Sequence, residues 1–247
     1  MSARRAGNGP QRATPSGPPQ ASSTADPDLA ADREHALAIV PVSRETVDRL
    51  DRFVAVLLRW QRQINLIAPS TERNLWTRHV ADSLQLIALA PQARIWADLG
   101  SGAGFPGLAI ACALAEIPKA RVHLVESNPK KIAFLREAIR ATGAPATVHP
   151  GKIEEFVANP PDPIEAVAAR ALAPLPKLLG LASPLLKTGT VGLFPKGQDA
   201  ALELTEASKY WNVQASLAPS RTDPKSHIVV VRARAEASYC SGRMIFT

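Results

Sequence analysis

The chain has 247 residues, 46% of them apolar, so it can form one large domain or two small ones with a substantial core. No apolar run approaches the length of a membrane span, and we expect a soluble protein that does not bind membranes. The formal charge of +7 favours a polyanionic partner, with nucleic acid first among them. With only Cys112 and Cys240, neither a disulfide framework nor a four-cysteine metal site is supported. Because His, Cys, Asp and Glu also lack metal-ligand spacing, we predict no metal.

The composition divides the chain into four parts. Residues 1–28 are rich in Pro, Gly, Ser and Ala and lack hydrophobic periodicity, which predicts a disordered tail. Residues 29–92 are predicted to form an N-terminal helical extension. Residues 93–235 are predicted to form the core domain, and residues 236–247 a short C-terminal tail.

Two helices are predicted inside the extension. The first follows Ser43, a suitable N-cap, and the second follows Ser70, which we expect to cap it. Apolar side chains recur at helical spacing in both segments. They are Val47, Leu50, Phe53, Val54, Leu57, Leu58 and Ile64 in the first helix, and Leu75, Val80, Leu84 and Ile87 in the second.

In the core domain, short β-rich runs alternate with helical segments. This alternation predicts an α/β fold with a doubly wound, mainly parallel sheet and helices on both of its faces. We expect seven strands, which are Ile95–Leu99, Val122–Glu126, Thr147–His149, Ala166–Arg170, Val191–Phe194, Val213–Leu217 and Ile228–Val231.

The stretch WADLGSGAGFPGLAIACAL, which begins at Trp96, predicts a strand, a glycine-rich turn and a helix. Such a turn offers backbone N–H groups to a nucleotide-like ligand. The letters GAGFPG from Gly102 fit the dinucleotide spacing, which makes an NAD(P)-dependent oxidoreductase one candidate. However, the carboxylate of Asp98 would repel a pyrophosphate and suits the cationic groups of S-adenosylmethionine. Because Pro106 also removes an N–H group from the anion cradle, we favour S-adenosylmethionine as the cofactor.

The second predicted strand ends at Glu126, about twenty residues after the glycines, where an acidic side chain can accept hydrogen bonds from ribose hydroxyls. This spacing fits either cofactor. The alternative is that Glu126 only favours the start of a helix that Ser127 or Asn128 caps, with Pro129 in its first turn. We favour ribose binding, because ligands of α/β sheets lie at the carboxyl ends of the strands.

Six segments of the sequence resemble, in order, the bacterial 16S ribosomal RNA (guanine-N7) methyltransferase family, also called glucose-inhibited division protein B. They are NLIAPSTERNLWTRHVADSL, WADLGSGAGFPGLAIA, VESNPKKIAFLRE, GKIEEF, AARALAPLPKLL and FPKGQDAALELTEA. The resemblance extends from Val42 to Arg234. It implies a class I (Rossmann-like) methyltransferase that uses S-adenosylmethionine to modify a guanine N7 in the decoding-region loop of small-subunit RNA.

The resemblance also implies roles for individual residues. It places Gly100 and Phe105 on the cofactor loop, Ile153 and Glu154 beside the adenine, and Arg170 at the end of the fourth strand. With the residues argued above, the predicted cofactor-binding set is Asp98, Gly100, Gly102, Gly104, Phe105, Glu126, Ile153, Glu154 and Arg170.

The sequence presents no clear nucleophile or general base, and we assign no catalytic residue. Guanine N7 carries a lone pair and no proton, so attack on a methyl group requires alignment more than proton removal. Lys196 and Arg232 are candidates to contact RNA phosphates, and His79 is a candidate for the rim of the site. Each also has a structural interpretation, as a solvated strand-end charge or as a helical histidine.

The predicted partner is 16S ribosomal RNA or the small ribosomal subunit, and we expect a cytoplasmic monomer. Two alternatives stay open. GAGFPG supports the oxidoreductase, and the basic charge supports a non-catalytic RNA-binding protein with a methyltransferase fold.

Overall fold

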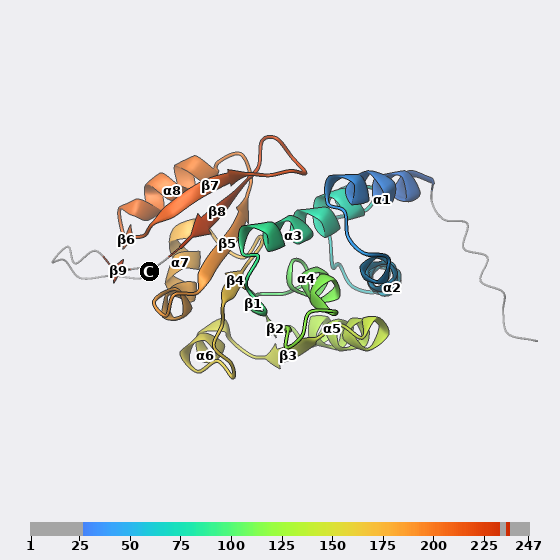
Figure 1. Cartoon of the computed structure of the whole chain (residues 1–247), viewed down its shortest axis with the longest axis horizontal. Coiled ribbons are helices and arrows are strands. Elements are labelled where there is room, and N and C mark those ends of the chain that lie inside the picture. Colours follow the sequence, from blue (N-terminus) through green and yellow to red (C-terminus); the bar gives the residue numbers. More distant parts are fainter. Residues whose placement is uncertain (1–26, 233–235, 238–247) are drawn as a thin grey trace, which may run out of the picture.

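The computed structural model describes residues 27–232 and 236–237. Apart from residues 27, 28, 236 and 237, the two predicted tails lie outside the described residues. Figure 1 shows a central sheet with helices on both sides, with α2 (Arg44–Gln61) beside α4 (Gly107–Leu114) and α5 (Pro129–Thr142), and α1 (Pro27–Ile39) beside the segment that contains α3 (Asp82–Leu84). No helix in the described part of the chain is long and apolar enough to cross a membrane.

Seven strands form the main sheet in the order β3-β2-β1-β4-β5-β8-β7. The strands β3, β2, β1, β4 and β5 are parallel to one another, and β8 is antiparallel to both β5 and β7. The predicted doubly wound, mainly parallel sheet is therefore confirmed. The strands are β1 (Ile95–Leu99), β2 (Arg121–Glu126), β3 (Ala146–Pro150), β4 (Ala166–Ala168), β5 (Val191–Lys196), β7 (Ala215–Pro219) and β8 (His227–Val231).

Two details of the strands differ from the prediction. The strand β4 ends at Ala168, so Arg170 belongs to the loop that follows it. The last hairpin begins later than expected, and a separate two-stranded sheet joins β6 (Trp211–Asn212) to β9 (Glu236–Ala237). Strands of two residues carry too little alternation for a sequence pattern to identify them.

The two faces of the sheet carry separate hydrophobic clusters. On β1, Trp96 packs into one cluster and Ala97 into the other, because successive side chains of a strand point to opposite faces. The first cluster includes side chains of the N-terminal extension, α4 (Gly107–Leu114) and α5 (Pro129–Thr142). The second includes α6 (Ile153–Ala158), α7 (Leu175–Leu186) and α8 (Ala200–Ser208).

The extension contains one helix that the sequence pattern missed and one that it placed correctly. Helix α2 (Arg44–Gln61) begins after Ser43, whose Oγ accepts a hydrogen bond from the Thr46 N–H at 3.1 Å, so the predicted cap is confirmed. Helix α1 (Pro27–Ile39) precedes it, and Ala36 is its one buried residue. A helix with so narrow a buried face leaves little apolar periodicity in the sequence.

The second predicted helix is a series of short elements: η1 (Pro69–Thr71, 3-10), η2 (Trp76–Ala81, a π-helix), α3 (Asp82–Leu84) and η3 (Gln85–Leu89, 3-10). The expected cap at Ser70 was wrong, because Ser70 lies inside η1 and is separated from η2 by a loop. The apolar residues Leu75, Val80 and Leu84 are nevertheless buried, as the helical spacing predicted.

Helix α4 packs closely against the sheet where it begins. The Gly107 N–H donates to Asp98 Oδ2 at 3.0 Å. A Cβ atom on Gly107 would lie 2.5 Å from Leu124 Cδ2 and 2.6 Å from Asp98 Cβ. Because Gly107 has no side chain, α4 can pack this closely against β1 and β2.

We expect Gly107→Ala to lower the free energy of unfolding by about 1–3 kcal/mol, because the added methyl group overpacks this contact. Urea denaturation followed by circular dichroism measures the change. Gly180→Ala in α7 is the matched control, since a Cβ there would meet Trp211 at an ordinary 3.5 Å. A Gly107→Ala protein as stable as the control variant would contradict this account of the packing.

Candidate functional site

A cavity of about 650 Å³ lies at the carboxyl edge of the parallel strands. The neighbours of β1 on its two sides are β2 and β4, so the cavity coincides with the switch point at which α/β sheets bind ligands. Its wall combines residues of the glycine turn with residues of the extension and of the loops after β4 and β5. The glycine turn contributes Gly100, Ser101, Gly102, Ala103 and Phe105.

The glycine turn has a backbone that glycine favours. Gly100, Gly102 and Gly104 have φ angles of +75°, +52° and +83°, all in the left-handed region. At Gly102 a Cβ atom would meet nothing closer than 3.7 Å, so this stretch of backbone is open to the cavity. At Gly100 and Gly104, in contrast, a Cβ atom would lie 2.8 Å from Leu172 and 2.9 Å from Phe53, so Gly102 is the glycine of the turn whose backbone a ligand can approach.

Glu126 at the end of β2 binds the glycine turn directly. Its side chain is buried, with 8% of the residue exposed. The carboxylate Oε2 accepts a hydrogen bond from the Gly102 N–H at 2.8 Å, and Oε1 accepts from the N–H groups of Ser127 (2.9 Å) and Asn128 (2.8 Å). Glu126 does not itself line the cavity. One carboxylate therefore joins the glycine turn to the start of α5.

The start of α5 follows the structural alternative considered for Glu126. Asn128 caps the helix, because its Oδ1 accepts hydrogen bonds from the N–H groups of Lys130 and Lys131, and Pro129 is the first helical residue. Since capping is already satisfied by Asn128, the carboxylate of Glu126 is available for the contact with Gly102.

Asp98 lies inside the protein at the base of the glycine turn, where 1% of it is exposed. Its Oδ2 accepts the hydrogen bond from Gly107, and its Oδ1 has no hydrogen-bond partner. Burial raises the pKa of this carboxyl to about 7. Asp98 is outside the cavity wall and holds the first turn of α4, and its predicted contact with the cationic groups of the cofactor stays a prediction.

Arg170 and His79 meet in the cavity wall although they lie on different parts of the fold. The Arg170 guanidinium donates to His79 Nδ1 at 2.6 Å and to the Arg78 carbonyl at 2.9 Å. The His79 ring stacks on Phe105 of the glycine turn, with ring centroids 5.2 Å apart, and its Nε2 lies 2.8 Å from Thr71 Oγ1. All of these side chains line the cavity.

His79 is neutral in this position. Burial, followed by the charges of Arg170 and Arg78, lowers its pKa to about 3. Because Nδ1 accepts from Arg170, we assign the single ring proton to Nε2, which faces Thr71. The Arg170 charge is partly balanced by Asp82, whose Oδ2 lies 3.5 Å from the guanidinium.

The cations that line the cavity differ in whether they have partners. Lys196 is 11% exposed at its side chain and donates to Glu203 Oε2 and the Ala173 carbonyl, both at 2.8 Å. Arg78 pairs with Asp223 at 3.1 Å. Lys131 lines the cavity beside Gly102, and the described residues provide no hydrogen-bond or ion-pair partner for its ammonium.

The sequence reasoning missed Lys131. A signal for it existed, because a lysine in the first turn of a helix opposes the helix dipole and needs another reason to be there.

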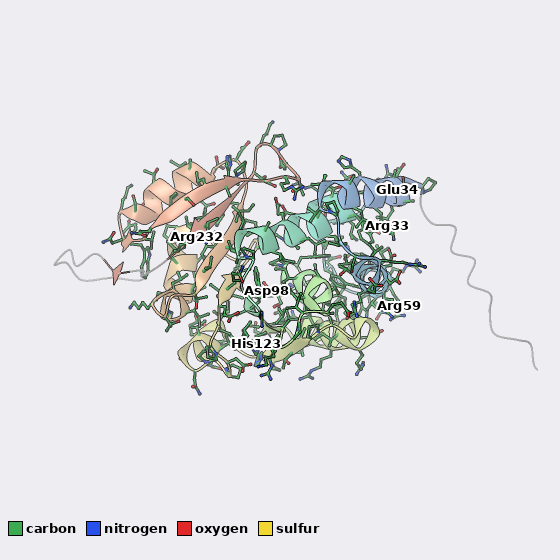
Figure 2. The ribbon with its side chains drawn as sticks, in the orientation of Figure 1. Arg33, Glu34, Arg59, Asp98, His123 and Arg232 are labelled. Carbon is green, nitrogen blue, oxygen red and sulfur yellow. The ribbon has the colours of Figure 1, made fainter. Side chains whose placement is uncertain are left out.

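Arg232 lies at the wrong edge of the sheet for the predicted phosphate contact. Because β8 runs antiparallel to β5, His227 pairs with Lys196 at the cavity edge, whereas Val231 pairs with Gly192. Arg232 follows Val231 at the opposite edge, where its guanidinium donates to the Leu89 carbonyl at 2.6 Å. His227, and not Arg232, lines the cavity. Figure 2 labels Arg232 and Asp98 for comparison.

Ile153 and Glu154 form the first turn of α6. Ile153 is partly buried against the second hydrophobic cluster, and Glu154 is exposed. Neither residue lines the 650 Å³ cavity. Within residues 27–232 and 236–237, no group of three His, Cys, Asp or Glu side chains is placed to hold a metal ion.

Known proteins resemble the chain over most of its length. The model of the family described as rRNA small subunit methyltransferase G matches residues 46–229. A protein named ribosomal RNA small subunit methyltransferase G from Bradyrhizobium sp. (strain ORS 278) is 56% identical over 213 residues, which are 86% of this chain and 96% of the relative. The protein of that name from Bradyrhizobium sp. (strain BTAi1 / ATCC BAA-1182) is 58% identical over 203 residues, which are 82% and 91% of the two chains.

A solved structure also shares the fold. The O-methyltransferase from Bacillus cereus in complex with SAH superimposes with a TM-score of 0.55 and 14% identity, covering 82% of this chain and 97% of that chain. This likeness agrees with the predicted class I methyltransferase fold. From the family match and the close relatives, the chain belongs to the rRNA small subunit methyltransferase G family, as its motifs predicted.

Proposed function

We propose that the chain transfers a methyl group from S-adenosylmethionine to N7 of a guanine in the decoding-region loop of 16S ribosomal RNA. One observation supports the proposal most strongly. In this member of the family, a glycine turn that is hydrogen-bonded to the buried carboxylate of Glu126 borders a 650 Å³ cavity at the switch point of the sheet. The methyl acceptor is this RNA, either alone or within the small ribosomal subunit. The protein acts on it as a monomer in the cytoplasm.

The residues of the cavity suit this cofactor. S-adenosylmethionine, when bound, supplies an electrophilic methyl group on a sulfonium centre. The volume lies within the range of about 300–1,000 Å³ that is usual for such ligands. Gly102 offers open backbone. Glu126 lies beside that backbone, outside the cavity wall, and in this proposal its carboxylate accepts hydrogen bonds from ribose hydroxyls. Ile153 and Glu154 lie outside the cavity wall, and the proposal assigns them to the adenine from the family resemblance; α6 follows β3, the strand next to β2.

The chemistry of guanine N7 agrees with the side chains that surround the glycine turn. N7 has a lone pair and no proton, so the site must align the base and need not remove a proton. His79 is neutral, and Arg170 and Thr71 engage its two ring nitrogens, so it is not available as a base. The partly exposed His79 ring, which stacks on the buried Phe105 ring, forms an aromatic wall of the cavity on which a planar base can stack.

The product of this reaction is a cationic base. A neutral His79 does not repel the charge that develops on the base. Lys131 is the cavity cation whose ammonium remains available, and we assign it an RNA phosphate ahead of Lys196, which Glu203 already binds.

With radiolabelled S-adenosylmethionine, we expect the purified protein to label bacterial 16S RNA or small-subunit particles that lack the modification. Borohydride reduction and aniline cleavage should then cut the labelled RNA at one guanine, because an N7-methylated ring opens under these conditions. Labelled RNA that resists cleavage would reject the N7 position. Labelling of DNA, protein or small metabolites without any labelling of RNA would reject the substrate.

We expect Lys131→Gln to weaken RNA binding and to reduce the slope of log K against log salt by about 0.7–0.9, the amount expected for one lost phosphate contact. Filter binding over a series of salt concentrations measures the slope. Lys130→Gln is the matched control, because Lys130 is the adjacent lysine of the same helical turn and does not line the cavity. Equal slopes for the two variants would contradict a specific role of Lys131.

A further inference from the structure

Helix η2 begins without a cap of its own. Leu75 occupies the N-cap position and provides no side-chain hydrogen bond. The free N–H groups of Trp76 and Thr77 instead donate to Oδ2 of Asp32, at 2.7 Å and 3.2 Å. The Thr77 hydroxyl donates to the other carboxylate oxygen of Asp32. A residue of α1 therefore performs the capping that a serine or aspartate next to the helix usually performs.

Helix α1 is itself held against the rest of the extension. Arg33, the residue after Asp32, donates two hydrogen bonds to the Asp51 carboxylate on α2, both at 2.7 Å. Its guanidinium carbon also lies 5.3 Å from the centroid of the Trp76 ring on η2. Figure 2 shows Arg33 on the side of α1 that faces α2, whereas Glu34 lies on the outer side. The position of α1 is thus coupled to both neighbouring helices.

Helix η2 in turn carries part of the cavity wall. It presents the His79 ring and the Arg78 carbonyl to the Arg170 guanidinium, at the distances given above. The same ring stacks on Phe105 of the glycine turn. A shift of η2 along its axis by less than the rise of one residue would weaken the hydrogen bonds from Arg170 to His79 and to the Arg78 carbonyl, because hydrogen bonds weaken steeply with distance and angle. Segments of π-helix also occur often at functional sites.

We propose that Asp32 is a positioning residue of the methylation site: by capping η2 from α1, it holds His79 and the Arg78 carbonyl on Arg170 and so fixes the aromatic wall for the target base. The inference rests on the proposed function. Asp32 touches neither cofactor nor substrate in this account, and its effect falls on the RNA step. The glycine turn and Glu126, which hold the cofactor, are not bound to α1.

The experiment compares Asp32→Ala and Asp32→Asn with the wild-type protein, and Glu34→Ala is the matched control. Glu34→Ala removes the same charge from the same helix without touching η2. We expect kcat/KM for 16S RNA to fall about tenfold in Asp32→Ala, as for a misplaced substrate-positioning group, while the Kd for S-adenosylhomocysteine changes less than about twofold. Asp32→Asn retains one acceptor oxygen and should fall between Asp32→Ala and the wild type.

A spectroscopic readout separates positioning from general stability. In wild-type protein the imidazole of His79 should not titrate between pH 5 and pH 8, because its pKa is about 3. In Asp32→Ala, loss of burial and of the contact with Arg170 should raise the pKa of His79 into this interval. Two-dimensional NMR of the histidine Cε1–H groups measures it, and His79→Gln assigns the signal. A variant that is only less stable would keep the wild-type titration while folded.

Two results would overturn the proposal. One is a folded Asp32→Ala protein with wild-type RNA kinetics and an unshifted His79 pKa; if that variant does not fold, the same result in Asp32→Asn decides. The other is an equal loss of activity in Glu34→Ala. A wild-type protein that does not methylate RNA would instead reject the proposed function, and the titration of His79 would still test whether Asp32 positions η2.

Discussion

The candidate site depends on one buried carboxylate that is surrounded by backbone N–H groups. Glu126 accepts three backbone hydrogen bonds, from Gly102, Ser127 and Asn128, and it thereby joins the turn after β1 to the turn after β2. A buried carboxylate needs such partners, since an unpaired charge in the interior is costly. The left-handed glycines allow the backbone to reach the carboxylate while the other side of the turn stays open to the cavity. The conformation of the glycine turn therefore depends on Glu126 as much as on the glycines.

The side of the cavity that we assign to the acceptor base lies at a second junction, between the extension and the core domain. Arg170, in the loop after β4, binds η2 through His79 and the Arg78 carbonyl, and the same histidine stacks on Phe105. The extension is therefore part of the cavity wall. Its helices contribute the neutral histidine, whereas the core contributes the glycine turn, with the Phe105 ring on which His79 stacks, and the available ammonium of Lys131.

Local patterns predicted the sheet well, because alternating β-rich and helical runs and the glycine turn are properties of neighbouring residues. Their spacing also singled out Glu126, whereas Arg170 came from the family resemblance, and the roles of both toward the cofactor stay predictions. Contacts between residues that are distant in sequence could not be predicted from such patterns. The antiparallel direction of β8 moves Arg232 to the far edge, and the cap of η2 comes from Asp32 at a separation of 44 residues. Lys131 left a local signal in the first turn of α5, but that its ammonium lacks a partner among the described residues is visible only in the structure. Each of these facts depends on residues that are distant in sequence.

The central claim is that the Glu126 carboxylate both fixes the glycine turn and binds the cofactor. Isothermal titration of S-adenosylhomocysteine into wild-type protein and Glu126→Gln tests it most directly, with circular dichroism to establish that the variant is folded. The account predicts a loss of about 1–3 kcal/mol in binding free energy for the variant, as for a charge-assisted hydrogen bond, and no binding of NAD or NADP to either protein. Wild-type affinity in a folded Glu126→Gln protein would contradict it.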